Sequence, residues 1–558
     1  MAAREEKQVR QPLKLNRRQF LRYTVVGGSA AAFLAACAVP SQDGGSGGGA
    51  PAAEAGGEAA AGSAGGGTLI IMGHHEVASL TPDDNGPDVH YVIINNIHNG
   101  LVWYNEYNEL EPVLAESYEV SEDGMTYTFK LREGVLFHDG KEFTSADVKY
   151  TYEFYGNPDN AMLSIGDFQS VGTVETPDDY TVVVNMDAVN AASLATWAEF
   201  GIVQSEYHAE VGEEVYRTAP IGTGAFKVKE WRPSEYTELE AFDDHFRGRP
   251  KIDILRLDVV PEPSVRMIAL QTGDAHSSVW PLLVEDSLVL AEDPNFLVYA
   301  TLGNSIKHFP LNTSLPQLSE KEVRQAMMHA LDRQRIIDEL WSGTATVAHS
   351  NIPPSSYYHR SDLKQYEYDP AKAAAMLDEA GWVVGDDGIR EKDGVKLSFT
   401  CTTISGDQAR RPIAELAQQL FAEVGIDMQL AESPSVLDGM RNGSLDASLF
   451  NWTYLTNAVE PDPFGTLHSD GGNNFCQISN PELDALIEEG VTIVNPEDRK
   501  PIYDRIQEIF VEEVPVLYLQ FDQWLIPFSR EVEGLPEDPA TSTEYYLRAY
   551  EFSLAGNG

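Results

Sequence analysis

Cysteine and basic residues are scarce in this chain of 558 residues. It has 3 cysteines, and its 39 Lys and Arg face 87 Asp and Glu, which gives a formal net charge of −48 at pH 7. Nucleic acid and anionic membrane surfaces are bound through basic patches, so the charge balance argues against both partners. Three cysteines also exclude a dense disulfide framework. We expect Cys401 and Cys476 to be small buried residues, and their spacing leaves open whether they pair.

Long hydrophobic runs are missing as well. A membrane-spanning helix needs roughly 20 apolar residues, and no segment of the chain approaches that length. The most apolar stretch, residues 25–36, is shorter and follows a basic segment that includes Arg17, Arg18 and Arg22. This order, basic and then apolar, is typical of a cleaved export signal.

Two motifs in this region resemble bacterial export signals. Residues 16–22 (Asn-Arg-Arg-Gln-Phe-Leu-Arg) resemble a twin-arginine signal, and residues 34–37 (Leu-Ala-Ala-Cys) resemble a lipobox. The second resemblance implies that Cys37 is lipidated and becomes the first mature residue. Residues 38–67 are almost wholly Gly, Ala and Ser, which predicts a flexible tether. We therefore expect an extracytoplasmic or periplasmic protein, held on the outer face of the cell membrane only through its lipid.

Catalytic motifs are equally hard to find. The sequence has no HExxH, no Walker A segment and no GxGxxG. Its one G-x-S-x-G match, residues 44–48, lies in the tether, without the strand and helix that make a nucleophile elbow. His74, His75, His90 and His98 carry imidazoles that suit nickel, but no carboxylate pattern braces them, so we interpret them as ordinary polar residues. We expect no catalysis, no cofactor and no metal site.

The mature part of the chain reads as mixed α/β. Period-two and β-branched patterns predict strands at residues 68–72, 126–131 and 180–185. A helix is expected to start at Thr144, and another over 371–380 between Asp369-Pro370 and Gly381. Ser319 with Glu322 predicts a capping box before one helix over 323–337. Alternating strands and helices favour α/β lobes.

A longer set of segments resembles family 5 of the extracytoplasmic solute-binding proteins, the oligopeptide, dipeptide and nickel class. The most specific run is residues 114–118 (Leu-Ala-Glu-Ser-Tyr), followed by residues 123–132 and 134–148. Further matches follow in the family's order at residues 220–226, 323–333, 368–382 and 480–484. The resemblance covers about residues 68–530. It implies an α/β fold, a two-lobed periplasmic-binding-protein clam-shell (type II, cluster C like) with an extra subdomain in lobe I.

The same resemblance implies a division of the chain and a set of partners. Residues 1–37 are expected to hold the signal and lipobox, and residues 38–67 the tether. Lobe I is expected to consist of residues 68–100, 221–305 and 520–558, with the extra subdomain at 101–220. Lobe II is expected to consist of residues 306–519. Closure of the two lobes on a small solute is a hinge motion that the permease subunits of an ABC importer detect. We expect a monomer.

The solute site is expected where the two lobes meet. By the resemblance, the candidate ligand-binding residues are His75, Glu76, Trp103, Tyr104 and Trp280 of lobe I, and Asn451, Trp452, Thr453, Tyr454, Asn457, Asn474 and Phe475 of lobe II. Such aromatic rings stack on sugars or on apolar side chains, and the amides fix orientation.

The solute itself stays open at this point. Peptide-binding relatives hold the ligand's α-amino group with an aspartate shortly after the position of Trp452, but residues 454–457 contain no carboxylate, and the next acids are Glu460 and Asp462. A buried ammonium without a charged partner is costly, which favours a neutral solute. The candidates are a peptide or an oligosaccharide, with a nickel chelate as the alternative cargo. An exported hydrolase and a surface scaffold lipoprotein are the alternative functions.

Overall fold

The structure, a computed structural model, describes residues 66–555 except 84–88, 108, 161, 163–164, 199, 280–281, 408, 454–462 and 540–543. The predicted export signal, the lipidation site Cys37 and nearly all of the tether lie outside the described residues. So do the candidate site residues Trp280, Tyr454 and Asn457, and the side chains of His90 and Thr453.

The local patterns that predicted secondary structure are confirmed at five places. The three predicted strands are β1 (Thr68–Gly73), β5 (Thr126–Leu131) and β7 (Thr181–Met186). Helix α3 (Ser145–Tyr155) starts after Thr144, whose backbone N–H donates to Asp147 Oδ2 at 3.0 Å. Helix α11 (Pro370–Glu379) starts where the Asp369 side chain accepts from the backbone N–H of Lys372, and it ends before Gly381 with φ +86°. Glycine tolerates that left-handed conformation without strain.

The single helix predicted over 323–337 is wrong. The structure has two helices, α9 (Lys321–Ala330) and α10 (Arg333–Leu340), with extended backbone at Leu331. The Ser319 hydroxyl donates to the carbonyl of Pro316, so it forms no capping box. Asp332 instead caps the second helix by accepting from the backbone N–H of Arg335. The break lets the buried Arg333 guanidinium donate to the carbonyls of Ala348 and Tyr366, contacts far along the chain that no local pattern reports.

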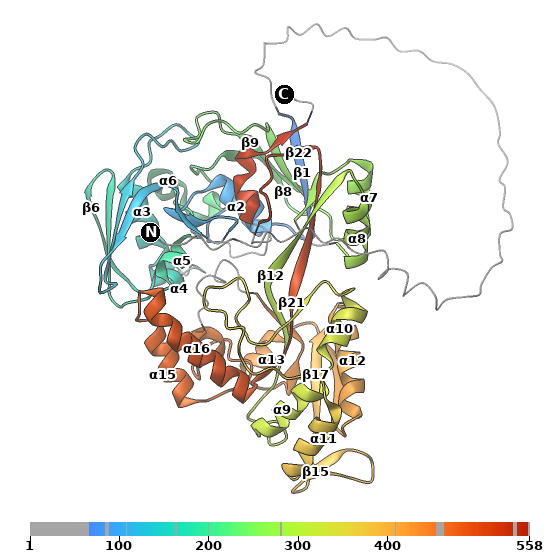
Figure 1. Cartoon of the computed structure of the whole chain (residues 1–558). Coiled ribbons are helices and arrows are strands. Elements are labelled where there is room, and N and C mark those ends of the chain that lie inside the picture. Colours follow the sequence, from blue (N-terminus) through green and yellow to red (C-terminus); the bar gives the residue numbers. More distant parts are fainter. Residues whose placement is uncertain are drawn as a thin grey trace, which may run out of the picture. The chain divides into compact units, whose positions relative to one another are not determined.

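A nine-stranded mixed sheet organises the fold. Its order is β20-β12-β21-β11-β1-β10-β9-β8, with β13 paired to β21. Figure 1 labels β1, β8, β9, β12 and β21 of this sheet. Its remaining strands are β8 (Phe226–Arg232), β9 (Tyr236–Ala241), β10 (Ile254–Val259), β11 (Ser277–Ser278), β12 (Phe296–Pro310), β13 (Thr346–Val347), β20 (Phe450–Thr453) and β21 (Val516–Ser529). Strands β12 and β21 are the longest, and they pair antiparallel along almost their full length.

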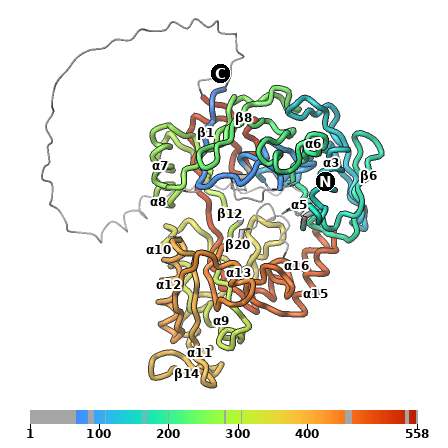
Figure 2. The backbone as a smooth tube through the Cα atoms, turned by 180° about the vertical axis from the view of Figure 1, so that it is seen from behind, coloured from blue at the N-terminus to red at the C-terminus, as the bar shows by residue number. Residues whose placement is uncertain are grey.

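These two long strands belong to two different hydrophobic cores. At one end, Tyr299 of β12 and Phe528 of β21 pack in a cluster with β1 and α2, which is the core of lobe I. At the other end, Phe309 and Leu517 pack in the core of lobe II. Figure 2 shows β12 from behind, running between the part that carries α7 and α8 and the part that carries α10 and α12. The fold is a two-lobed α/β fold.

The remaining elements fall around these cores. Residues 101–221 contribute a third cluster, built on a four-stranded antiparallel sheet in the order β4-β5-β7-β6. Its elements are β2 (Val102–Tyr104), β3 (Leu110–Pro112), β4 (Ala115–Val120), β6 (Val171–Asp178), η1 (Pro158–Asn160), α4 (Ile165–Phe168), α5 (Ser193–Ala198) and α6 (Ser205–Tyr216). Lobe I adds α2 (Val89–Ile97), α7 (Pro263–Thr272), α8 (Val284–Glu292), β22 (Val532–Glu533), η3 (Glu544–Glu551) and β23 (Ser553–Leu554).

Lobe II is built on a parallel sheet in the order β18-β17-β19. Its elements are β14 (Val383–Val384), β15 (Arg390–Lys392), β16 (Val395–Lys396), β17 (Ser398–Ile404), α12 (Arg410–Ala422), β18 (Asp427–Ser433), α13 (Leu437–Arg441), β19 (Ala447–Ser448), α14 (Phe464–Leu467), α15 (Pro481–Gly490) and α16 (Pro496–Glu513). Cys401 and Cys476 are buried, unpaired thiols in this lobe, as expected, and burial raises the pKa of each to about 12. Within the described ranges, every helix is too short or too polar to cross a membrane.

Candidate functional site

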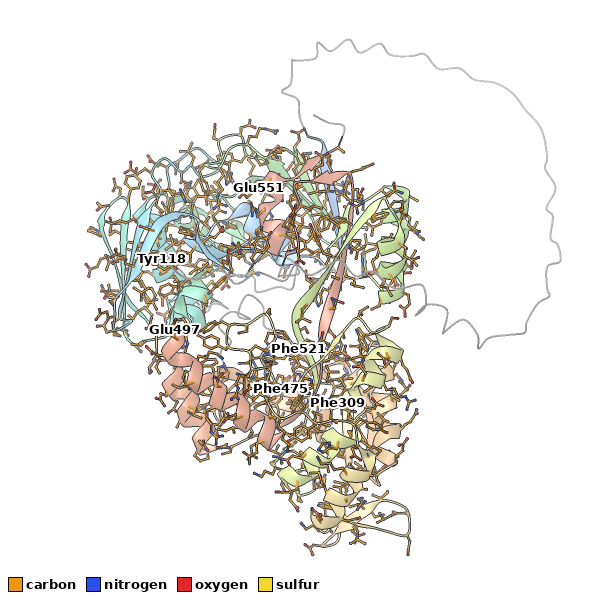
Figure 3. The ribbon with its side chains drawn as sticks, in the orientation of Figure 1. Tyr118, Phe309, Phe475, Glu497, Phe521 and Glu551 are labelled. Atoms are coloured by element: carbon orange, nitrogen blue, oxygen red, sulfur yellow. The ribbon has the colours of Figure 1, made fainter. Side chains whose placement is uncertain are left out.

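Two of the predicted aromatic residues lie together in lobe II, beside the long strands. Strand β20 pairs antiparallel with β12, which places Trp452 opposite Ile306. The Phe475 ring packs edge-on against Trp452, with 5.6 Å between centroids, and against Phe450 at 5.4 Å. Figure 3 marks Phe475 in lobe II, where β12 and β21 enter it with Phe309 and Phe521. Trp452 and Phe475 thus form one aromatic corner.

This aromatic corner lines a small cavity of about 40 Å³, together with His308, Asn351 and Asn473. The Asn351 side chain is 7% exposed, and its Oδ1 has no hydrogen-bond partner among the described residues. Small-molecule sites are mainly apolar with a few polar groups, as here, but they measure roughly 300–1,000 Å³, so this hollow is only one part of a ligand site. Sequence reasoning missed Asn351, because an isolated Asn carries no pattern.

The neighbouring candidate Asn474 has a different role in the structure. Its Nδ2 donates to the carbonyl of Ile478 at 2.8 Å, and its Oδ1 accepts from the Ile478 backbone N–H at 3.0 Å. Both ends of the amide therefore hold the turn that carries Phe475.

A buried polar network lies where β12 and β21 change register. Lys307 of β12 forms an ion pair with Asp522 of β21, and both side chains are about nine-tenths buried. Gln520 Nε2 donates to Asp522 Oδ1 at 2.8 Å, and Asn451 Nδ2 lies 3.4 Å from Asp522 Oδ2 and 3.2 Å from Ser305 Oγ. The Asn451 and Gln520 side-chain oxygens have no partner among the described residues.

The network includes one predicted residue, Asn451, and four residues that sequence reasoning missed, which are Ser305, Lys307, Gln520 and Asp522. The available signal was a charged residue inside each of two apolar strands, Lys307 in β12 and Asp522 in β21. Such charges are almost never buried unless they are paired. Successive side chains of a strand point to opposite faces, so Asn451 and Lys307 lie on the face of the sheet away from Trp452 and Ile306, and no residue of the network lines the cavity at the aromatic corner.

The lobe I candidates at the end of β1 contact each other and a nearby turn. The rings of His74 and His75 lie edge to face, with 3.9 Å between centroids. Burial, and then the charge of His75, lower the pKa of His74 to about 3, so the ring is neutral near pH 7. Glu76 accepts from the backbone N–H and the hydroxyl of Ser234. Within the described part of the chain, no three His, Cys, Asp or Glu residues are grouped to hold a metal ion.

The other lobe I candidates, Trp103 and Tyr104, lie on β2 and line a second cavity with residues of α2 and η3. None of the residues that line this cavity belongs to lobe II. The structure therefore does not bring Trp103 and Tyr104 together with Trp452 and Phe475.

His308, which lines the cavity at the aromatic corner, predicts how the stability of the protein depends on pH. Burial lowers the pKa of His308 to about 4, below its ordinary 6.5. Between about pH 6.5 and 4 the unfolded chain therefore binds a proton at His308, whereas the folded protein keeps this side chain neutral. The free energy of unfolding consequently decreases as the pH falls through this range. We expect His308→Gln to flatten the pH dependence of the free energy of unfolding by at most about 1.4 kcal/mol per pH unit. Parallel urea-denaturation curves for variant and wild type over this range would contradict the prediction.

Comparison with known proteins agrees with this arrangement. Residues 109–474 match the family described as bacterial extracellular solute-binding proteins, family 5, middle. The chain is also 30% identical over 474 residues to the oligopeptide-binding protein AppA of Bacillus subtilis, a match that covers 82% of this chain and 86% of the relative. The chain belongs to family 5 of the bacterial extracellular solute-binding proteins. This confirms the resemblance found in the sequence.

Solved structures of family 5 proteins have the same fold. The AppA structure, in complex with a nonapeptide, has a TM-score of 0.75 at 28% identity and covers 88% of this chain and 99% of its own. NikZ from Campylobacter jejuni, in complex with Ni(L-His), has a TM-score of 0.76 at 26% identity and covers 87% and 99%. Family 5 members are extracytoplasmic substrate-binding proteins that deliver peptides or other small solutes to ABC permease components. The chain is a solute receptor of this transport class.

Proposed function

We propose that this receptor binds its solute against the aromatic corner of lobe II, on Trp452 and Phe475, and then closes lobe I over it. The observation that carries this proposal is the path of β12 and β21, which pair in both hydrophobic cores. Their register shifts between Leu302 and Ile306, next to the Lys307–Asp522 pair. A bulge bends a strand locally, so we place the hinge there. The hydrophobic clusters support the predicted boundaries between lobe I, the extra subdomain and lobe II.

We propose a peptide or an oligosaccharide as the solute. The names of the relatives favour a peptide, since AppA is an oligopeptide-binding protein seen with a nonapeptide. The charges favour a solute without a free ammonium, because Asp522 is already bound by Lys307, Gln520 and Asn451. The acids Glu460 and Asp462 lie outside the described residues. A nickel chelate is the alternative cargo, because NikZ was solved in complex with Ni(L-His).

Binding with closure and without turnover is the test of the proposal. Calorimetric screening of peptides, cello- and xylo-oligosaccharides and nickel–histidine should find one class that binds tightly. The bound solute should then lower the radius of gyration in solution scattering, because closing lobes make the protein more compact. The solute should be recovered unaltered after long incubation, since we propose that the protein is not an enzyme. A chemically changed solute, or tight binding without compaction, would contradict the proposal.

We further propose that the protein is a monomeric lipoprotein, exported by the twin-arginine route and anchored only through Cys37. Cys37→Ser removes the sulfur that forms the thioether to the lipid. We expect the variant to incorporate no radiolabelled palmitate and to leave the membrane fraction. Ser41→Ala, a substitution in the same tether that keeps the thiol, is the matched control and should behave as wild type. Equal labelling of wild type and Cys37→Ser would refute the anchor.

A further inference from the structure

We propose that lobe I contains a second binding site, for a small organic carboxylate, in the cavity between α2, the β2–β3 hairpin and η3. The cavity has a volume of about 180 Å³, larger than the cavity at the aromatic corner. Liquid water occupies roughly 30 Å³ per molecule, so the space holds several waters or one small organic ligand. This cavity shares no lining residue with the cavity at the aromatic corner.

Two hydrogen-bond donors in the wall of this cavity have no partner. Asn95 of α2 is 7% exposed, and its Nδ2 is buried without an acceptor among the described residues. The indole Nε1 of Trp103 on β2 is likewise buried and without an acceptor there. Buried donors are nearly always satisfied in proteins, and leaving one unsatisfied is costly. Two orphan donors on the walls of one cavity indicate a ligand that supplies acceptor oxygens.

Two arginines and two glutamates line the cavity, and one of the arginines, Arg247, has no ion pair in the described part of the chain. Arg548 donates to Glu106 Oε1 at 2.6 Å, and it also forms an ion pair with Glu551. Glu111 accepts from Asn105 Nδ2 at 2.8 Å. Both carboxylates that line the cavity, those of Glu106 and Glu111, therefore already have donors of the protein.

Arg247 is an exposed arginine at the edge of the cavity. Its guanidinium donates to the hydroxyl of Tyr550 at 3.1 Å and lies 5.6 Å from that ring, but it forms no ion pair within the described part of the chain. An arginine held by an aromatic group at a cavity with two spare donors matches the chemistry of a carboxylate, which accepts through both oxygens. The two donors and the Arg247 guanidinium therefore suit the two acceptor oxygens of a carboxylate.

The other walls of the cavity are suited to an apolar ligand body. The rings of Trp103, Tyr104 and Tyr550 and the side chains of Val113 and Leu547 line it. Aromatic walls of this kind pack against flat or aliphatic groups. An inorganic anion would leave these walls in contact with water, so we assign the site to a carboxylate with a hydrophobic body, for which benzoate is a suitable probe.

Calorimetric titration of the purified full chain with benzoate tests the site, with benzamide as the neutral probe of the same shape. We expect saturable binding of benzoate and at least tenfold weaker binding of benzamide. Arg247→Gln should weaken benzoate binding about 10- to 100-fold, the range for a lost charged hydrogen bond. Trp103→Phe keeps a ring but removes the orphan N–H, and should weaken binding about three- to tenfold. Arg335→Gln, the same charge change on the exposed face of α10, should have no effect.

Three results would overturn the proposal. One is the absence of saturable benzoate binding to the wild-type chain. The second is equal binding of benzoate and benzamide, which would show an apolar cavity without anion recognition. The third is unchanged benzoate affinity in both Arg247→Gln and Trp103→Phe, with circular dichroism showing that the variants are folded. Each outcome is distinct from failure of the lobe II site, which is measured with a different ligand and different variants.

Discussion

Replacing Asp522 by alanine is expected to destabilise the protein by about 3–5 kcal/mol, the usual cost of breaking a buried ion pair from one side. The substitution leaves the Lys307 ammonium buried, with the Trp341 ring 4.9 Å away as its remaining favourable contact. It also removes the acceptor that Gln520 Nε2 uses at 2.8 Å. Urea denaturation followed by far-UV circular dichroism measures the loss.

A double variant separates the buried charge from the side-chain contacts. Lys307→Met with Asp522→Leu removes both charges and keeps apolar volume, so it should recover most of the stability that Asp522→Ala loses. Glu339→Ala breaks the exposed pair with Arg335 on α10 and should cost less than about 1 kcal/mol. If Asp522→Ala costs no more than Glu339→Ala, the Lys307–Asp522 pair does not stabilise the strands at the proposed hinge.

Truncating Trp452 is expected to cost about 2–4 kcal/mol of solute binding, which corresponds to roughly 30- to 1000-fold in dissociation constant. The ring packs edge-on against Phe475 and lines the cavity with His308. Alanine would remove the largest apolar surface of the aromatic corner, whereas Trp452→Phe keeps a ring and should retain part of the affinity. Calorimetry with the solute identified by screening gives both values. Trp231→Ala, a tryptophan of β8 in lobe I, is the control and should leave the affinity unchanged.

The pH dependence of the same binding curve tests the charge of the solute. An α-amino group has a pKa of about 7.7–8.0, so a peptide held by its ammonium loses affinity as the pH rises through about 8. A solute without a free ammonium should bind about equally between pH 6 and 9. Steep loss above pH 8, together with collapse of binding in Glu460→Gln, would assign the solute to the peptides and leave the receptor function intact.

Much of the fold was predictable from the sequence because its determinants are local. The alternation at 126–131 and the cap and stop around 371–380 concern neighbouring residues, and the structure confirms them. The family also followed from the motif run at 114–148, since motifs repeat the turns and packing positions of a fold. The helix over 323–337 was predicted wrongly because its break at Leu331 depends on Arg333, whose acceptors lie at Ala348 and Tyr366.

The candidate site was predictable only in part. The sequence by itself determined the family, through its run of motifs, and the mixed α/β class, through local patterns; Trp452 and the residues around it are candidates that the family resemblance implies. Only the tertiary structure decided which candidates share a cavity, as Phe475 does with Trp452 and as Trp103 does with Arg247. Lys307 and Asp522 are 215 residues apart in the sequence. No local pattern brings such residues together, since their contact exists only when two distant strands pair in one register.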